Sequence, residues 1–425
     1  MITHLRGARR GRLAVPRLAV LTAGTLAGAG IPALGLMAAP ASAAPNPVCT
    51  GAVNVTCTFA ATGSATNWRV PFGVTSLTVI ADGGAGADAR STFVTGGGAG
   101  GKGGEYEATL SGISFPTTLS VFPGRAAFRA TGGVNAGGKG GDSSSDTNGD
   151  RGGSGGGASS VAIAPFSVSN LLVVAGGGGG GSAENEAADT PGDGGTGGGS
   201  TNFFGTPGGT GTGSTTNGTG GTSVIPGFAG SGPSGGCSTP AGGAQLNGGA
   251  AQAGATSCPF AGGGGGSGYF GGGGGGTGGG GGGGGPFPDP TGTTAGGITV
   301  TPRPDLNTNA GNGSVTIEYT AVVNTTDLSV WSARSGGGVT LFARLTANSG
   351  QPVPGEPVSF STGVVQWCTN VVTNSSGVAS CSLSRYETAL LREQFGVFSA
   401  YFGGDTPGGL PAASATGVAQ TGGFF

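Results

Sequence analysis

The sequence predicts an all-β protein made of antiparallel sandwiches, and three observations support this fold class. Gly and Pro, which most disfavour the interior of a helix, number 103 and 25 among 425 residues. Short β-branched runs bounded by Gly, Pro or Asn recur along the chain, which is typical of strands. No stretch of ten or more residues shows a convincing helical period. An ordinary helical enzyme is therefore disfavoured.

Residues 1–43 have the features of a secretory signal peptide. Five arginines precede an apolar stretch that runs to about Met37, and Ala41-Ser42-Ala43 is a small-residue cleavage signal. We expect cleavage after Ala43 and no membrane span in the exported chain. A retained membrane anchor is the alternative, and the glycines and Pro32 within the apolar stretch disfavour it.

Removal of this leader limits the chemistry of the exported chain. It takes away five Arg and also His4, the only His, and leaves a net charge of −7. Such a chain lacks the basic surface that binds nucleic acid. Without His there is no catalytic triad, His base or His metal ligand. We therefore predict a protein that is not an enzyme and has no cofactor, apart from the calcium considered below.

Six cysteines remain, and an even number in an exported chain favours disulfides over reactive thiols. Other pairings are formally possible, but pairing of neighbours closes short loops within single segments. The predicted pairs are Cys49–Cys57, Cys237–Cys258 and Cys368–Cys381. The close Cys-x-x-Cys pairs typical of a zinc site are missing.

A change in Gly content near residue 320 marks the predicted boundary between two domains, 44–320 and 321–425. Gly makes up about 30% of the first and about 14% of the second. The expected strands of the first domain are the apolar runs at 54–59, 75–81, 104–110, 117–122, 170–175, 297–301 and 313–319. They predict an antiparallel sandwich with long Gly-rich insertions, the largest from about 176 to 296.

These insertions allow two interpretations. As solvated linkers, Gly/Ser/Thr tracts need no structure, and composition alone favours this. Alternatively, tracts such as 176–181 and 271–276 form extended helices of the polyproline II type, with three residues per turn, that pack backbone against backbone. Ordering six glycines costs roughly 3 to 6 kcal/mol more than ordering six alanines. Only a lattice of hydrogen bonds between segments could offset that cost.

Several runs together resemble a known family. The sequences VPFGVTSLTVIADGGAGA, GGAGGKGGEYEATLSG, LLVVAGGGGGG, AGGGGGSGYFGGGGGG and NGSVTIEYT are similar to the glycine-rich domain of the anaplastic lymphoma kinase and leukocyte tyrosine kinase receptors and its secreted bacterial relatives. The resemblance covers roughly residues 50–320. It implies a jelly-roll-like sandwich with a packed bundle of polyglycine helices. No kinase domain accompanies it, so neither phosphorylation nor cytokine binding is implied.

The last hundred residues predict a second, immunoglobulin-like β-sandwich. Strand-like runs begin at 327, 338, 356, 366, 377 and 396, separated by Gly, Pro and Asn. The stretches QPVPGEPVSFSTG and TNSSGVASCSL resemble bacterial immunoglobulin-like repeats of invasins and adhesins. Across a hairpin turn at 374–377, Cys368 and Cys381 would staple neighbouring strands.

Two catalytic patterns occur by chance in so Gly-rich a chain. Residues 96–102 and 133–139 fit a phosphate loop, but Gly follows each Lys where a Ser or Thr is required. Residues 152–156 and 232–236 fit the nucleophile pattern G-x-S-x-G, but no His can serve as the base. The sequence therefore predicts neither nucleotide binding nor serine catalysis.

Acidic loops supply the one candidate metal site. Asp146, Asn148 and Asp150 place oxygen ligands at alternate positions, as calcium requires. A calcium-binding loop requires Gly at the position that Arg151 occupies here. The alternative interpretation of these residues is a solvated turn without a metal ion. A second acidic cluster at 184–193 is interpreted as a solubilising loop.

Aromatic residues between the Gly tracts are candidate ligand contacts. Tyr269 and Phe270, with Phe203, Phe204 and Phe287, could stack on a glycan, but we favour a role in pinning the Gly tracts to the sandwich. The three tryptophans, Trp68, Trp331 and Trp367, lie in strand-like runs and are expected in the core or on a sheet surface.

The sequence as a whole favours a secreted, noncatalytic protein with a structural or adhesive role at the cell surface. Its partners would be a cell-envelope glycan or another surface protein. The alternative is a module that binds a glycan or receptor through the aromatics of its Gly loops.

Overall fold

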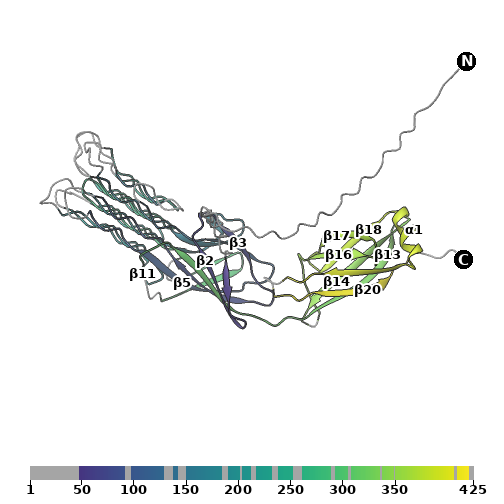
Figure 1. Ribbon diagram of the computed structural model, residues 1–425. Coiled ribbons are helices and arrows are strands. Elements are labelled where there is room, and N and C mark those ends of the chain that lie inside the picture. Colours follow the sequence, from purple (N-terminus) through teal and green to yellow (C-terminus); the bar gives the residue numbers. More distant parts are fainter. Residues whose placement is uncertain are drawn as a thin grey trace, which may run out of the picture. The chain divides into compact units, whose positions relative to one another are not determined.

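The computed structural model is an all-β protein (Figure 1). The residues that it describes are 47–90, 97–128, 137–141, 150–183, 190–201, 203–211, 217–231, 238–251, 261–288, 292–304, 308–335, 337–348, 350–405 and 409–420. Residues 45–425 form one compact unit. The predicted leader lies outside the described residues.

The larger sheet of the first sandwich holds eight strands, all paired antiparallel, in the order β1-β2-β12-β4-β5-β10-β9, with β11 beside β5. Their bounds are β1 (Val48–Thr50), β2 (Asn54–Ala60), β4 (Ser76–Asp82), β5 (Gly103–Ser111), β9 (Thr293–Ala295), β10 (Ile298–Arg303), β11 (Thr308–Asn309) and β12 (Ser314–Thr320). The last of these strands, β12, inserts between β2 and β4. The chain therefore returns to the middle of this sheet after the Gly-rich insertions, all of which precede β12 in the sequence.

A second sheet, β3-β6-β7-β8, packs against the first. Its strands are β3 (Thr66–Arg69), β6 (Thr118–Phe122), β7 (Ser159–Ile163) and β8 (Leu171–Ala175), with a 3₁₀ turn, η1 (Val168–Asn170), before β8. The core between the sheets contains Phe59, Trp68, Tyr106, Leu119 and Leu172, all buried. Period-two alternation in strands such as β4 supplies these side chains.

Strand β8 is buried on both faces, which explains its uninterrupted apolar sequence. Leu172 and Val173 enter the core between the sheets. Leu171 and Val174 point to the opposite side, where they join a small cluster with residues of the Gly tracts. The tracts therefore cover the outer face of this sheet.

All seven strands predicted for the first domain are present, each within two residues of its expected bounds. Strands β1, β3, β7, β9 and β11 were not among the predicted runs. Trp68 lies in the core, and Trp331 lies on a sheet surface, 42% exposed and stacked on Phe342 of the neighbouring strand; both places agree with expectation. Trp367 is half-buried against the second core.

The second sandwich consists of two four-stranded sheets, one with β13-β14-β15 and β18 beside β14, the other with β17-β16-β19-β20. The bounds are β13 (Thr326–Ser335), β14 (Gly338–Ala347), β15 (Gln351–Pro352), β16 (Pro357–Ser361), β17 (Gln366–Val372), β18 (Val378–Leu383), β19 (Val397–Phe402) and β20 (Ala413–Val418). Leu341, Leu345, Phe360, Phe398 and Phe402 form its core.

One α-helix, α1 (Arg385–Glu393), interrupts the second sandwich and was not predicted. Ser384 and Glu387 form a capping box at its start. The Ser384 N–H and hydroxyl bind the carboxylate and hold the pKa of Glu387 below its usual range. The Ser-x-x-Glu spacing was the available signal, but nine residues are too few to show a clear helical period.

Two predicted disulfides are present. Cys49 and Cys57 face each other across β1 and β2, with Cα atoms 4.0 Å apart. Cys368–Cys381 also forms, but the hairpin expected around it is wrong, because β17 pairs with β16 while β18 pairs with β14. This disulfide therefore joins the two sheets of the sandwich rather than neighbouring strands. Cys237 and Cys258 lie outside the described residues.

Candidate functional site

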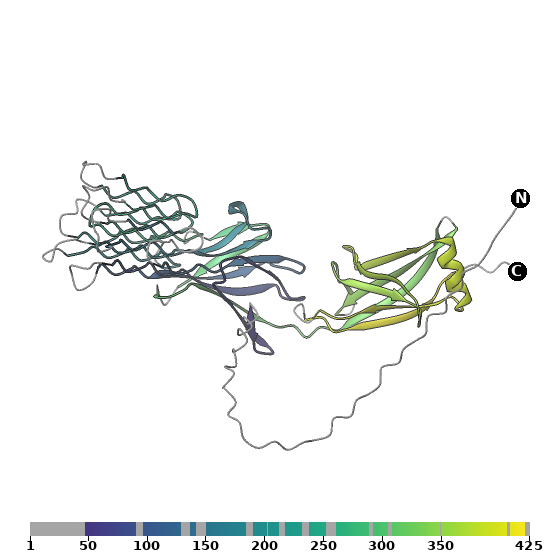
Figure 2. The ribbon, with the colours of Figure 1, turned by 45° about the horizontal axis from the view of Figure 1, so that its top comes forward.

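The Gly tracts form a lattice of extended threads, visible as wavy traces side by side in Figure 2. The thread at 176–182, which continues directly from β8, shows its geometry. Successive N–H groups of this thread donate to the carbonyl oxygens of Gly198, Ser267, Gly84, Gly195, Gly264, Ala87 and Gly192. The first, fourth and seventh of these acceptors lie on one neighbouring segment. The hydrogen bonding therefore repeats every three residues.

The carbonyl groups of the same thread follow the same repeat toward three other segments. Those of residues 176–181 accept from the N–H groups of Gly104, Gly284, Gly156, Gly101, Gly281 and Gly153 in turn. A helix with three residues per turn points its N–H groups in three directions and its carbonyls in three more. The thread 176–182 is thus bonded to six neighbours, and its buried backbone groups are satisfied.

Such close contact leaves no space for a side chain at the glycine positions. A Cβ built on Gly180 would overlap the backbone of Gly153, and one built on Gly274 would overlap the backbone of Ala250. Both obstructing groups are main chain rather than flexible side chain, so they cannot move aside cheaply. The Gly content is therefore required by the packing, and the ordered interpretation of the tracts is correct over the described residues.

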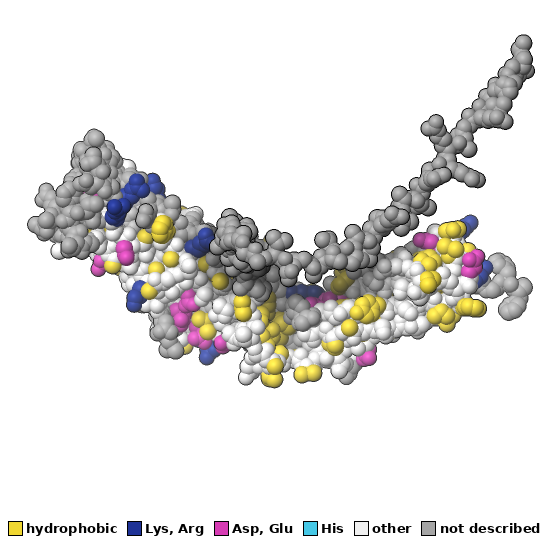
Figure 3. Space-filling model, viewed as in Figure 1, with side chains coloured by type: hydrophobic (Ala, Val, Ile, Leu, Met, Phe, Trp, Pro, Cys, Tyr) yellow, Lys and Arg dark blue, Asp and Glu magenta, His cyan; other side chains and the backbone are white. Residues whose placement is uncertain are grey.

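Short polar side chains complete the lattice where a backbone partner is missing, a role that sequence reasoning did not identify. Asp88 Oδ1 accepts the Gly100 N–H at 2.7 Å, and Asp193 Oδ1 accepts the Ala99 N–H at 2.8 Å. The Ser182 hydroxyl accepts from Gly192 and donates to Gly278. In Figure 3, the described surface of this region is mostly white, since small and uncharged groups dominate it.

Tyr269 and Phe270 are the candidate ligand contacts, and Tyr269 lies between the lattice and the sandwich. The Tyr269 ring stacks on Phe287 with centroids 4.3 Å apart and meets the Phe270 ring edge-on. Tyr269 and Phe287 also pack against Leu171 and Val174 of β8. This is the pinning arrangement, and it occupies one face of the Tyr269 ring.

The sequence matches to a phosphate loop and to the G-x-S-x-G pattern are part of the lattice wherever the structure describes them. Ser154, within one G-x-S-x-G match, is fully buried and accepts a hydrogen bond from the Gly140 N–H at 2.9 Å. In one phosphate-loop match, the N–H groups of Gly98 and Gly101 donate to Ser182 and Gly179. The buried Ser154 hydroxyl is therefore not accessible to a substrate, and the N–H groups of Gly98 and Gly101 are not free to bind a phosphate.

The predicted calcium ligands are only partly described. Asp150 is buried, with 2% of its surface exposed, whereas Asp146 and Asn148 lie outside the described residues. No group of three or more His, Cys, Asp or Glu residues within the described ranges could hold a metal ion. From the second acidic cluster, Asp193 is described and serves the lattice as above, while 184–189 lie outside.

An open groove of about 710 Å³ is lined by residues of β2, β4 and β12 and of the segment that precedes β4. Thr56, Glu318 and Thr78 form a row of paired residues across β2, β12 and β4 on its floor. Val74 and Val322 contribute apolar walls. The groove therefore offers hydroxyl groups and one carboxylate to a small polar ligand.

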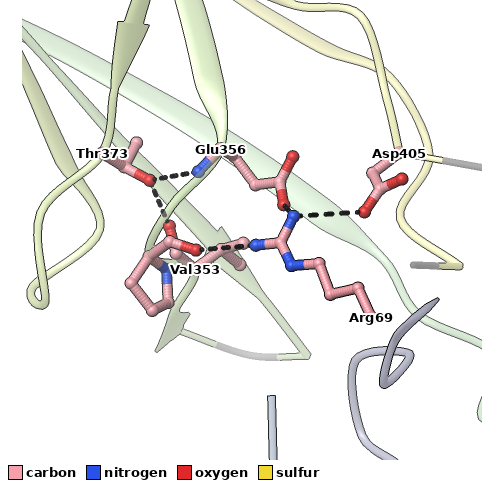
Figure 4. A network of polar contacts seen from close by, with 6 residues as sticks. Arg69, Val353, Glu356, Thr373 and Asp405 are labelled. Carbon is pink, nitrogen blue, oxygen red and sulfur yellow. Dashed lines mark hydrogen bonds and ion pairs between the residues drawn. The ribbon is translucent and has the colours of Figure 1, made fainter. Parts of the chain in front are cut away.

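A polar network links the end of β3 to loops of the second sandwich (Figure 4). Arg69 Nη1 lies 2.5 Å from Glu356 Oε1 and 3.6 Å from Asp405 Oδ2. The guanidinium also covers the Phe115 ring, 4.2 Å from its centroid. The Glu356 backbone N–H donates to the Thr373 hydroxyl, which donates to the Val353 carbonyl. The Arg69 guanidinium therefore forms ion pairs with two carboxylates, those of Glu356 and Asp405.

Burial of Glu356 controls the electrostatics of this network. Only 3% of its side chain is exposed, against 28% for Arg69. Burial raises the pKa of Glu356 above its ordinary value, Asp405 raises it further, and Arg69 opposes both. Sequence reasoning missed the network because its members lie about 300 residues apart.

No known protein family matches the chain, and a search of curated proteins finds no relative. Within the described residues, no helix has the length and apolar character needed to cross a membrane.

Proposed function

We propose that this protein is a secreted, noncatalytic structural or adhesive component of the cell surface. The observation that carries the proposal is the glycine lattice, in which the thread 176–182 uses its N–H and carbonyl groups to bind six neighbours. Cooperative packing of this kind resists local opening, and so resists proteases and unfolding outside the cell. The two disulfides also suit an oxidising compartment.

The described residues offer no arrangement that favours catalysis. Ser154 is buried within the lattice, and the carboxylates of Glu356 and Asp405 both lie against the Arg69 guanidinium. An adhesive scaffold needs a stable shape and exposed contact surfaces, which the lattice and its loops would provide. The resemblance to receptor glycine-rich domains is part of this proposal. It concerns the fold alone and implies no kinase activity.

Hydrogen exchange on the chain from residue 44 onward tests the proposal. Amides at 176–181 and 271–275 should exchange as slowly as those of β4 and β5, because each is buried and donates to a carbonyl of another segment. Exchange at the rate of an unfolded coil would refute the scaffold. A broad hydrolase screen of the same material should show no turnover, and any turnover would overturn the noncatalytic role.

The alternative is an extracellular glycan-binding module, and the groove over Thr56, Thr78 and Glu318 favours it. The notion that Tyr269 binds the ligand predicts that Tyr269→Ala abolishes binding on a glycan array. Binding through the groove predicts that Glu318→Gln abolishes it instead. If the unmodified chain binds no glycan on the array, the glycan-binding alternative is excluded and the structural role remains.

A further inference from the structure

Four exposed apolar side chains gather on neighbouring threads of the glycine lattice. They are Phe204, Val224, Ile225 and Phe228, with exposed fractions of 61, 69, 50 and 67%. We call these four residues the apolar patch. Large apolar side chains are rare in a lattice built of Gly, Ser and Thr, so their grouping in one place requires an explanation.

Backbone pairing places the four residues close together. Phe204 forms an isolated bridge with Thr222, and the Thr222 N–H donates to the Ile225 carbonyl at 2.9 Å. On the same pair of threads, the Thr219 N–H donates to the Phe228 carbonyl at 3.0 Å. The patch therefore spans three adjacent segments, 203–209, 217–222 and 224–230.

Two threonine hydroxyls bind the backbone of three of the four patch residues. Thr222 Oγ1 accepts the N–H groups of Val224 and Ile225 at 3.0 and 2.8 Å, and Thr219 Oγ1 accepts that of Phe228 at 2.6 Å. The Gly227 N–H is bound by the Gly271 carbonyl in the lattice. The apolar side chains are thus presented on a fixed support, which lowers the entropy lost on binding.

The surrounding sequence is free of charge over an unusual length. No Asp, Glu, Lys or Arg occurs between Asp193 and Asp289. The neighbouring backbone is also engaged, since Gly205, Gly218 and Gly221 donate their N–H groups to other threads. A surface that enters lipid must carry few charges and satisfy its backbone hydrogen bonds internally. The uncharged sequence from 194 to 288 fits the first condition, and the bonded N–H groups of Gly205, Gly218 and Gly221 fit the second.

We propose that the apolar patch docks onto the surface of an uncharged lipid layer, with its four side chains inserted at the headgroup boundary. The inference rests on the proposed function and deepens it, since it names what would retain an exported scaffold at the cell surface. Neither a charged lipid nor a nucleic acid fits, because the patch lacks the basic residues that would attract an anion.

A second copy of the chain fits this surface less well than lipid does. A stable interface between proteins buries about 800 Å² per partner and involves some 20 to 30 residues on each side. Four side chains fall short of that area. Partition into lipid has no such threshold, because each buried apolar side chain contributes separately to binding.

Sedimentation with vesicles of zwitterionic phosphatidylcholine tests the inference on the chain from residue 44 onward, which includes the whole compact unit. The protein should bind the vesicles, and raising the salt from about 0.1 to 0.5 M should leave binding unchanged. Phe228→Ser should weaken binding about tenfold, and Phe204→Ser with Phe228→Ser about a hundredfold.

The matched control is Phe128→Ser, because Phe128 is 71% exposed but lies outside the patch. This variant should bind within about twofold of the unmodified chain, and Val224→Ser, also in the patch, should weaken binding if Phe228→Ser fails to fold. Absence of vesicle binding, an equal loss in the control, or a dimer that disappears in Phe228→Ser without lipid binding would each overturn the inference. Slow hydrogen exchange at 176–181 in the same sample would show that the lattice is ordered, so the proposed structural role would remain even if the lipid inference failed.

Discussion

The two halves of the compact unit satisfy their backbone hydrogen bonds in different ways. In the second sandwich, strands pair within flat sheets and side chains such as Phe360 and Phe398 fill the space between them. In the glycine lattice, the thread 176–182 bonds to neighbours in six directions, and its glycines have no room for a larger side chain. One region is stabilised mainly by apolar burial, and the other mainly by hydrogen bonding and close backbone contact.

The largest effect is expected from a side chain placed inside the lattice. Gly274→Val should destabilise the protein by at least about 3 kcal/mol, because the new Cβ overlaps the backbone of Ala250. The control is Gly363→Val in the second sandwich, where no atom lies within 4 Å of the new Cβ. Thermal unfolding of both variants checks this. Similar melting temperatures for the two variants would remove the distinction between the regions.

Loss of Arg69 should have the next largest effect, since it leaves Glu356 buried without a cation. We expect Arg69→Met to destabilise the protein by about 2 to 3 kcal/mol at neutral pH, less than for a fully buried pair because Arg69 is partly exposed. Adding Glu356→Gln should recover most of the loss. Chemical denaturation of the single and double variants measures their free energies of unfolding. A double variant no more stable than Arg69→Met would contradict the ion pair between Arg69 and Glu356.

The same network predicts a pH dependence. The pKa of Glu356 is raised in the folded protein, so the carboxyl group binds its proton more tightly there than in the unfolded chain. Its contribution to stability is therefore full below the unfolded pKa and is lost as the pH rises through the folded pKa. Glu356→Gln should flatten this part of the profile of melting temperature against pH. An unchanged slope would assign the pH dependence to other groups.

Removing the disulfide between the sheets should cost about 2 to 3 kcal/mol. Cys368→Ala with Cys381→Ala frees two sheets that the bond now joins, and the effect should be confined to the second sandwich. Hydrogen exchange resolved by segment would show faster exchange in β17 and β18, with the thread 176–182 unchanged. Faster exchange in that thread would show that the two regions unfold together.

The smallest effect is expected at the contact between lattice and sandwich. Tyr269→Leu should destabilise the protein by about 1 kcal/mol, because it keeps much of the apolar contact but removes the stack on Phe287. Phe204→Leu, at a ring that is 61% exposed, is the control and should change stability by less than about 0.5 kcal/mol. Thermal melts of equal shape and midpoint for both would show that Tyr269 does not pin the lattice.

Local patterns predicted much of this fold, and distant contacts account for what they missed. Runs such as 75–81 alternate in burial because a strand has a two-residue period, so sequence alone locates β4. The partner of Cys381 was also predictable from spacing, but the sheet that holds its strand was not. The Arg69 network depends on residues brought together only by the folded chain, and no local pattern encodes it.

For the candidate site, composition alone favoured solvated linkers, and only the family resemblance indicated ordered Gly tracts; neither predicted which threads would pair. Ser154 and Asp193 read as a nucleophile match and a solvated acid, whereas each provides a hydrogen-bond acceptor for a lattice N–H. Such roles depend on which backbone hydrogen-bond partner is missing at a given place in the folded lattice. The sequence pattern alone does not show where a partner is missing.

The three-residue repeat of the lattice also limits how these threads can change in length. Inserting or deleting a triplet returns every later residue to the same orientation, so its hydrogen bonds can form with the same neighbouring thread. Adding one or two residues instead rotates the rest of the thread by a third or two thirds of a turn and directs each donor at the wrong neighbour. Length variation among chains of this architecture should therefore occur in multiples of three inside the threads and without restriction in the loops that connect them.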